Sequence, residues 1–92
     1  MSEGPMPLHN GPIKLARGHR VQHEPVQGCD VLLYPEGVVQ LNESAAIILK
    51  QVDGKRTAVD IAAELNRQYP GEDLTADVRE FLEVANARGW IT

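Results

Sequence analysis

Cysteine and long apolar runs are scarce in this chain of 92 residues. Its one cysteine, Cys29, excludes an intramolecular disulfide. The longest unbroken apolar run, residues 45–49, is far too short to span a bilayer. The first five residues also lack the charged and then apolar layout of a secretory signal. We therefore expect a cytoplasmic protein that does not bind a membrane.

Aromatic residues are also few, at 4% of the chain, so valine, isoleucine, leucine and alanine must fill the interior. The length allows one domain, and a chain of this size buries only roughly 60% of the surface that its unfolded form exposes. Because such a core is thin, a bound partner chain is a natural source of extra stability.

The charge is unevenly distributed along the chain, whose net charge is -4. Residues 1–20 contain Lys14, Arg17 and Arg20 against Glu3, whereas the remaining residues contain six Lys or Arg against twelve Asp or Glu. A folded domain this acidic repels phosphate backbones, whose attraction to basic surfaces supplies most non-specific affinity for nucleic acid. The charge therefore argues against a nucleic-acid partner.

No arrangement typical of an active site or a metal site stands out. The glycines form no nucleotide-binding pattern, and no Ser/His/Asp arrangement can be argued. His19, His23 and Cys29 are irregularly spaced for zinc, and only His9 could complete a set of four ligands. Asp30, directly after Cys29, disfavours a reactive thiolate. We expect no enzyme activity, no metal and no cofactor.

The N-terminal residues differ in composition from the rest. Residues 1–13 contain Pro5, Pro7, Pro12, Gly4 and Gly11 and show no apolar period. Nothing there can offset the entropy of ordering the chain. We expect a flexible tail over residues 1–13 and one folded domain over residues 14–92.

Strand signals come first in the folded part. Residues 20–23 can form a short strand that Pro25 ends, and Gly28 marks a turn. Residues 31–34 and 38–41 are β-prone runs separated by Pro35, Glu36 and a glycine. Proline suits an early turn position and glycine accepts a positive φ near the end of a turn, so we expect a hairpin with a positive φ at that glycine, Gly37.

Three stretches with apolar spacings of three and four residues follow, and each predicts an amphipathic helix. Asn42 or Ser44 can cap the first helix, and Thr57 can cap the second, where Asp60 gives a shorter version of the capping box. A glycine should end each helix. The expected ends are Gly54, Gly71 and Gly89, and the apolar stripes are Ala45, Ile48, Leu49 and Val52, then Ala58, Ile61, Ala62, Leu65 and Tyr69, then Leu74, Val78, Phe81, Leu82 and Ala85.

This order of elements predicts an α+β fold. Each helix has one apolar face, so the three helices must pack on one another and on the hairpin. The arrangement is winged helix-turn-helix-like, with short N-terminal strands and a hairpin ahead of three packed helices. If residues 38–41 lie at the sheet edge, their free backbone groups can accept an added strand. The alternative, that the tail or another strand covers this edge, stays open.

Several stretches resemble the PqqD family in their order and spacing. They are residues 41–49 (LNESAAIIL), 52–57 (VDGKRT), 61–65 (IAAEL) and 77–82 (DVxxFL), and the turn at 34–37 (YPEG) fits as well. The resemblance extends from about residue 15 to residue 91, which is nearly the whole folded part.

The resemblance implies a winged-helix peptide-binding domain, a RiPP recognition element of a pathway that modifies ribosomally made peptides. Family members hold the precursor peptide as an added strand beside the third strand and against the third helix. In the biosynthesis of pyrroloquinoline quinone (PQQ), the implied partners are the precursor peptide PqqA and the radical-SAM enzyme PqqE, which cross-links a Glu and a Tyr of PqqA. Such a chain would be a non-catalytic peptide chaperone without a cofactor.

The resemblance also implies a set of binding residues. Val38 and Gln40 would offer backbone and side-chain contacts, and Arg79 could pair with a carboxylate of the peptide. Val78 and Leu82 would line the opposite wall, although plain core packing explains each of them equally well. The complete expected set is Val38, Val39, Gln40, Leu41, Val78, Arg79 and Leu82.

Two alternatives concern the partner. The same fold could serve a DNA-binding regulator, because fold does not fix function. A DNA-reading helix should be basic, but the third predicted helix sets Arg79 and Arg88 against Asp77, Glu80 and Glu83. A free edge strand would also permit a homodimer that pairs through that edge.

Overall fold

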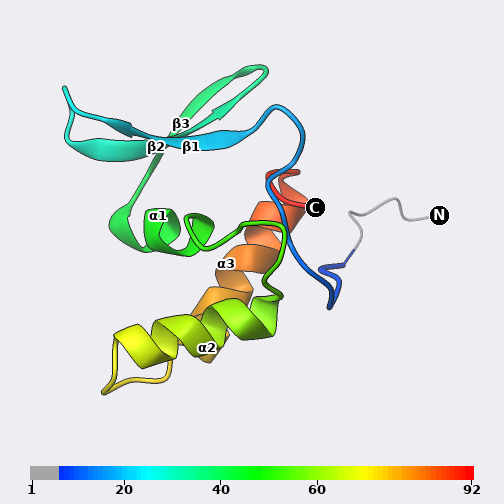
Figure 1. Cartoon of the computed structure of the whole chain (residues 1–92). Coiled ribbons are helices and arrows are strands. Elements are labelled where there is room, and N and C mark those ends of the chain that lie inside the picture. The colour runs from blue at the N-terminus through cyan, green and yellow to red at the C-terminus, as the bar shows by residue number, and fades with distance from the viewer. Residues whose placement is uncertain (1–6) are drawn as a thin grey trace.

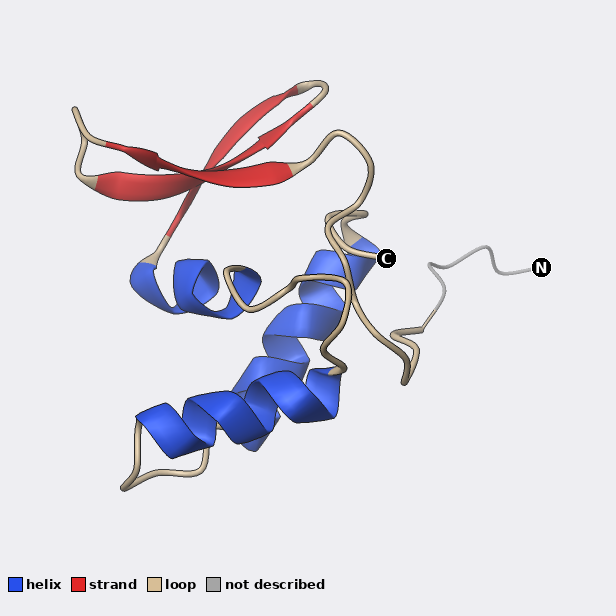
Figure 2. Ribbon diagram, in the orientation of Figure 1, coloured by secondary structure: helices blue, strands red, loops and turns tan. Residues whose placement is uncertain are grey.

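A three-stranded antiparallel sheet lies on one side of three helices in the computed structural model, which describes residues 7–92 (Figure 1, Figure 2). The predicted α+β class and the predicted order of strands before helices are confirmed. The elements are β1 (Arg20–Glu24), β2 (Cys29–Tyr34), β3 (Gly37–Leu41), α1 (Glu43–Leu49), α2 (Ala58–Gln68) and α3 (Thr75–Ala87).

The sheet has the order β1–β2–β3, so β2 is the central strand. Leu32 of β2 pairs with Val21 of β1 and with Val39 of β3, which places these three side chains on one face of the sheet. Leu32 is fully buried, and the other two pack against the core. This face of the sheet therefore covers the helices.

The turn between β2 and β3 contains only two residues, Pro35 and Glu36, because Tyr34 pairs directly with Gly37. The positive φ expected at Gly37 is wrong: in residues 7–92 positive φ occurs at five other glycines, among them Gly28 at 68° in the β1–β2 turn. Gly37 is instead the first residue of β3. The pairing of the hairpin therefore continues without a break to its tip.

Local capping explains where two helices begin. Asn42 is the N-cap of α1, and its side chain accepts a hydrogen bond of 2.8 Å from the backbone N–H of Ala45. Ser44, the alternative cap, lies inside the helix. Thr57 and Asp60 form the predicted capping box of α2, with two reciprocal bonds of 3.1 Å.

The folded part begins earlier than residue 14. Ile13 is fully buried; its N–H donates to the carbonyl of Arg56 at 2.9 Å, and its carbonyl accepts from the N–H of Gly54 at 2.8 Å. The backbone of Gly54 therefore binds the N-terminal segment at Ile13 and does not end α1, which already ends at Leu49. Leu8 also packs against the core. Residues 1–6 of the predicted tail lie outside the described residues.

One apolar core joins the elements, and the two ends of the domain meet beside it. Lys14 and Thr92 exchange backbone hydrogen bonds of 3.0 and 2.8 Å, which ties the N-terminal segment to the chain after α3 (Figure 1). The longest helix of the described part, α3, has 13 residues, so none of these helices could cross a bilayer. The fully buried side chains of largest volume are Ile13, Leu32, Leu49, Ile61, Leu65, Leu82 and Val78.

Candidate functional site

Strand β3 forms one edge of the sheet, since it pairs with β2 alone among residues 7–92. Tyr34 and Gly37 flank a two-residue turn, so they exchange backbone hydrogen bonds, and bonded pairs alternate from there. The N–H and C=O groups of Val38 and Gln40 therefore point outward from the sheet. No other segment of the described chain forms a backbone hydrogen bond with them. This edge can pair with an added strand.

The side chains of β3 differ in exposure. Val38 is 57% exposed, Gln40 is exposed and donates to the Gln27 side chain, and Val39 is half-buried. Leu41 is buried and closes the core beside α1. Of the four binding residues expected on this strand, Val38, Val39 and Gln40 are accessible from the surface, whereas the side chain of Leu41 is not.

The apolar stripe of α3 belongs to the core. Val78, Leu82 and Ala85 repeat at intervals of four and three residues, and their exposed fractions are 2%, 0% and 0%. The structure therefore corrects the expectation that Leu82 lines a binding wall, and core packing, the alternative left open for it, applies. Val78 is a core residue too, and only its outer edge lines a cavity, as described below.

Arg79 lies on the flank of α3 that turns away from Arg88. Each residue advances about 100° around a helix axis, which places Arg79 nearly opposite Arg88 and places Asp77 on the same flank as Arg88. The Arg79 guanidinium lies 3.5 Å from the carboxylate of Glu83. Arg88 and Asp77 each line a hollow of the surface, whereas Arg79 is not part of the lining of either hollow.

The first hollow, which we call the Trp90 hollow, has a volume of about 460 Å³ and includes Val39, Arg88 and Trp90 in its lining. The guanidinium carbon of Arg88 lies 5.5 Å from the centre of the indole ring, within the range of a cation–π contact. A stacked pair of His19 and Tyr34, with ring centres 5.8 Å apart, lines the same hollow. Aromatic surface, the cation of Arg88 and the carboxylate of Glu36 thus lie beside β3.

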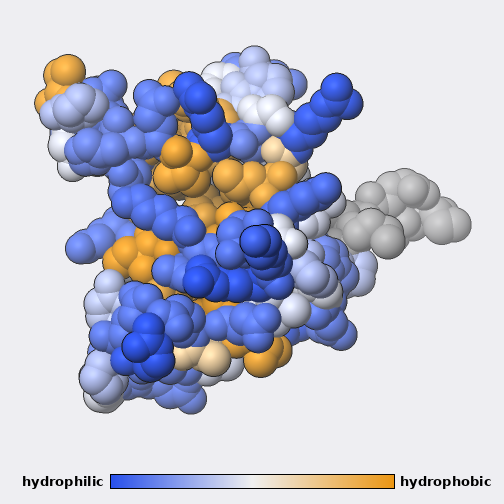
Figure 3. Space-filling model, viewed as in Figure 1, coloured by the Kyte–Doolittle hydropathy of each residue, from blue (hydrophilic) through white to orange (hydrophobic). Residues whose placement is uncertain are grey.

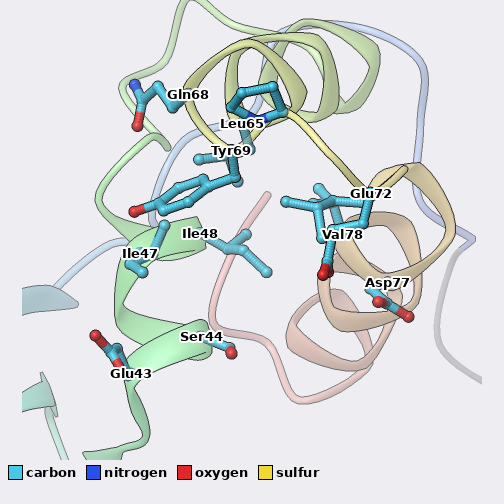
Figure 4. Close-up of a pocket in the computed structure, with 12 residues that line it drawn as sticks. Glu43, Ser44, Ile47, Ile48, Leu65, Gln68, Tyr69, Glu72, Asp77 and Val78 are labelled. Carbon is cyan, nitrogen blue, oxygen red and sulfur yellow. The ribbon is translucent and has the colours of Figure 1, made fainter.

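The second hollow, which we call the α1–α3 cavity, has a volume of about 690 Å³ and lies between α1, the end of α2 and the start of α3 (Figure 4). Its lining includes Ile47 and Ile48 of α1 and Val78 of α3. Glu43, the first residue of α1, lines it as well and follows β3 after a single residue. The cavity therefore lies where β3 ends.

The two hollows mark the ends of one surface. Along β3 the chain runs from Val39 at the Trp90 hollow towards the α1–α3 cavity, and along α3 it runs back from Asp77 to Arg88. Apolar side chains reach the surface between the sheet and the helices in Figure 3. We define the β3–α3 face by the residues of the edge and of this flank: Val38, Val39, Gln40, Phe81, Val84, Arg88 and Trp90.

Four residues of this face were missed in the sequence, although a signal exists for three of them. Phe81, Val84 and Arg88 are spaced by three and four residues, so they form a second stripe beside the buried one. Phe81 is partly buried and Val84 is 43% exposed, which is typical of a surface at the border of a core. Trp90 follows the helix, and its position depends on the tertiary fold.

The strongest charge contacts lie outside this face. Lys50, 2.9 Å from Asp30, and His23, 3.1 Å from it, hold the pKa of the Asp30 carboxyl below its usual range. Lys50 ties the sheet to the end of α1, and His23 ties β1 to β2. Hydrogen bonds from Arg67 and Gln68 lower the pKa of Glu64 to about 2. These groups stabilise the scaffold.

The three residues considered for a metal have other contacts. His23 pairs with Asp30, His19 Nδ1 donates to the carbonyl of Arg17 at 3.0 Å, and Cys29 is half-buried without a second thiol nearby. Within residues 7–92 no group of three or more His, Cys, Asp or Glu side chains could hold a metal ion. The accessible chemistry of the face is therefore backbone pairing, apolar contact and one cation.

Comparisons with known proteins identify the family of this chain. Residues 29–91 match the family described as Coenzyme PQQ synthesis protein D (PqqD). The chain is 57% identical over 79 residues to a PqqA binding protein of Azotobacter vinelandii, covering 85% of this chain and 86% of that protein. It is 55% identical over 76 residues to a PqqA binding protein of Stutzerimonas stutzeri, covering 82% and 83%.

A solved structure shares the fold. The solution NMR structure of the PqqD truncation of Methylobacterium extorquens PqqCD, described as a functional and stand-alone RiPP recognition element, superposes with a TM-score of 0.71 at 30% identity and 87% coverage of both chains. None of these relatives is described as a DNA-binding protein, so the DNA-binding alternative gains no support. The chain belongs to the PqqD family.

Proposed function

We propose that this chain is a cytoplasmic, non-catalytic peptide chaperone that binds the precursor peptide PqqA by strand addition at β3 and presents it to the radical-SAM enzyme PqqE. The observation that carries the proposal is the free edge of β3, where the backbone groups of Val38 and Gln40 point outward. The relatives named PqqA binding protein support the choice of peptide.

The β3–α3 face supplies what strand addition needs. Backbone hydrogen bonds to Val38 and Gln40 give affinity for any extended peptide, and hollows for alternate side chains give specificity. The half-buried Val39 and the partly exposed Phe81 and Val84 provide apolar contact. Arg88 replaces Arg79 in the proposed site as the cation for a carboxylate of the peptide.

The separate roles of this chain and of PqqE follow from the chemistry of the face. The chain contributes binding and positioning, and PqqE makes the covalent bond in PqqA. A peptide held as a strand has a fixed direction and register, because a shift by one residue would turn every side chain to the other face. Presentation therefore consists of holding the reactive part of PqqA at a constant distance from β3.

Calorimetric titration with synthetic PqqA tests the binding step. We expect saturable binding of one peptide per chain, and we expect PqqE to modify PqqA faster when the chain is present. No binding, whether PqqE is present or absent, would show that the partner is wrong. If PqqA binds but PqqE modifies it no faster, only the proposed presentation to PqqE is refuted.

The free edge also permits a homodimer, because a second copy can pair with it as the peptide would. If two copies pair through β3, addition of PqqA must convert the dimer to a monomer. Size-exclusion chromatography with and without PqqA measures this directly. A dimer that persists with bound peptide would use another surface.

A further inference from the structure

The floor of the α1–α3 cavity is apolar. Ile48 and Val78 point into it, and the ring of Tyr69 lies over Ile47 at one side (Figure 4). Tyr69 is 46% exposed and Ile47 is half-buried, so both retain surface that a ligand could cover. The volume, about 690 Å³, is within the usual range for binding pockets and exceeds that of any single side chain.

The rim of the cavity is acidic. Glu43, Glu72 and Asp77 line it, and Glu43 and Asp77 stand on opposite sides (Figure 4). No lysine, arginine or histidine is part of the lining. In the described part of the chain, none of the three carboxylates forms a salt bridge, in contrast to Asp30 and Glu64.

Helix termini explain two of these acids only in part. Glu43 and Asp77 lie in the first turns of α1 and α3, where a negative charge is favourable. Glu72 precedes α3 and has no such role. Together the three charges attract a cation and repel a carboxylate.

The cavity also continues the proposed peptide site. A peptide paired with β3 that runs on past Leu41 reaches Glu43 and the cavity within about two residues, since strands advance about 3.3 Å per residue. The same peptide lies along the flank of α3 that carries Asp77. A side chain of the peptide can therefore enter the cavity without a break in the strand.

Charge decides among the candidate occupants. A second copy of this chain, with a net charge of -4, would bring acidic surface to an acidic rim. Residues 1–6 contain no lysine or arginine. We propose that the α1–α3 cavity binds an apolar side chain of the precursor peptide, next to a lysine or arginine of that peptide which pairs with Glu43, Glu72 and Asp77. This inference rests on the proposed function, because one peptide occupies both sites.

The test is a titration of PqqA into three chains: the wild type, the double variant Glu72→Gln/Asp77→Asn, and the control Glu80→Gln. Glu80 is exposed on α3 and is not part of the lining of the cavity, so the control removes a charge of the same kind from outside it. We expect the double variant to lose about tenfold in affinity at low salt and to depend less on salt. The control should match the wild type.

A second peptide identifies the cation. PqqA with its lysine and arginine residues replaced by glutamine should bind the wild type weakly, and the double variant should discriminate little between the two peptides. Filling the cavity with Ser44→Trp should weaken PqqA binding further, because Ser44 is an exposed residue of the lining. Circular dichroism confirms that each variant is folded.

The outcomes separate the two proposals. If the wild type fails to bind PqqA, the proposed function fails. If PqqA binds the wild type and all variants equally, the peptide does not use the cavity and this inference alone is overturned. If the variants lose only the effect on PqqE, the acidic rim contacts the enzyme, which also contradicts this inference.

Discussion

Asp77 and Arg88 lie on the same flank of α3, Asp77 at the α1–α3 cavity and Arg88 over the indole ring of Trp90. Eleven residues of helix separate them by roughly 16 Å, the length of about five residues of a strand. A peptide on β3 therefore meets a cation beside Val39 and acids beyond Leu41.

Removal of Arg88 should weaken peptide binding. We expect Arg88→Ala to lose about tenfold in affinity for PqqA, because a charge-assisted hydrogen bond to a peptide carboxylate is lost. The loss of the cation–π contact with Trp90 should change the unfolding free energy by no more than about 1 kcal/mol. Arg79→Ala is the matched control, since Arg79 pairs with Glu83 on the opposite flank. Calorimetric titration measures both. An equal loss in both variants would contradict the assignment of Arg88.

Leu82 should act through stability alone. Its side chain is fully buried, so Leu82→Ala removes apolar contacts and leaves a cavity, at a cost of about 2–5 kcal/mol in the free energy of unfolding. Urea denaturation measures this cost. At a temperature where the variant is folded, its affinity for PqqA should equal that of the wild type; a selective loss of affinity would return Leu82 to the binding wall.

Ile13 should prove to be part of the domain. Ile13→Ala is expected to cost about 2–4 kcal/mol, because the side chain is fully buried, while the control Lys14→Ala removes an exposed side chain and keeps the backbone pairing with Thr92. Thermal unfolding compares the two. If both variants were as stable as the wild type, the flexible tail predicted from the sequence would extend to residue 13 after all.

The Glu64 carboxylate should make the stability of the fold depend on pH. Its pKa is lowered from 4.5 to about 2 by hydrogen bonds from Arg67 and Gln68, so the folded state favours the ionised carboxylate. The resulting stabilisation is complete above pH 4.5 and is lost as the pH falls towards 2. The difference in Tm between wild type and Glu64→Gln should shrink through this range. A difference that grows on acidification would have the wrong sign.

Local patterns were sufficient to predict the elements of the fold. The capping box of Thr57 and Asp60 and the cap at Asn42 involve residues three apart, and the hairpin strands form where the β-prone runs predict them. Each of these signals depends on neighbours in the sequence.

What could not be predicted depends on distant contacts. Ile13 lies in a segment rich in proline and glycine, and its burial comes from a crossing with Gly54 and the carbonyl of Arg56, some forty residues away. Which of the two arginines, Arg79 or Arg88, lies on the side of α3 next to β3 depends on the direction in which α3 crosses beneath the sheet. A stripe of apolar residues shows which face of a helix is buried, but not which of its two flanks borders β3.

Strand addition at β3 is the central claim, and one pair of variants tests it most directly. Val38→Pro removes the outward N–H and places a ring in the path of an added strand, without loss of a bond to β2, whereas Val38→Ala keeps that N–H. In titrations with PqqA, we expect Val38→Pro to lose about tenfold or more in affinity and Val38→Ala less than about threefold. Equal affinities in two folded variants would contradict strand addition at this edge.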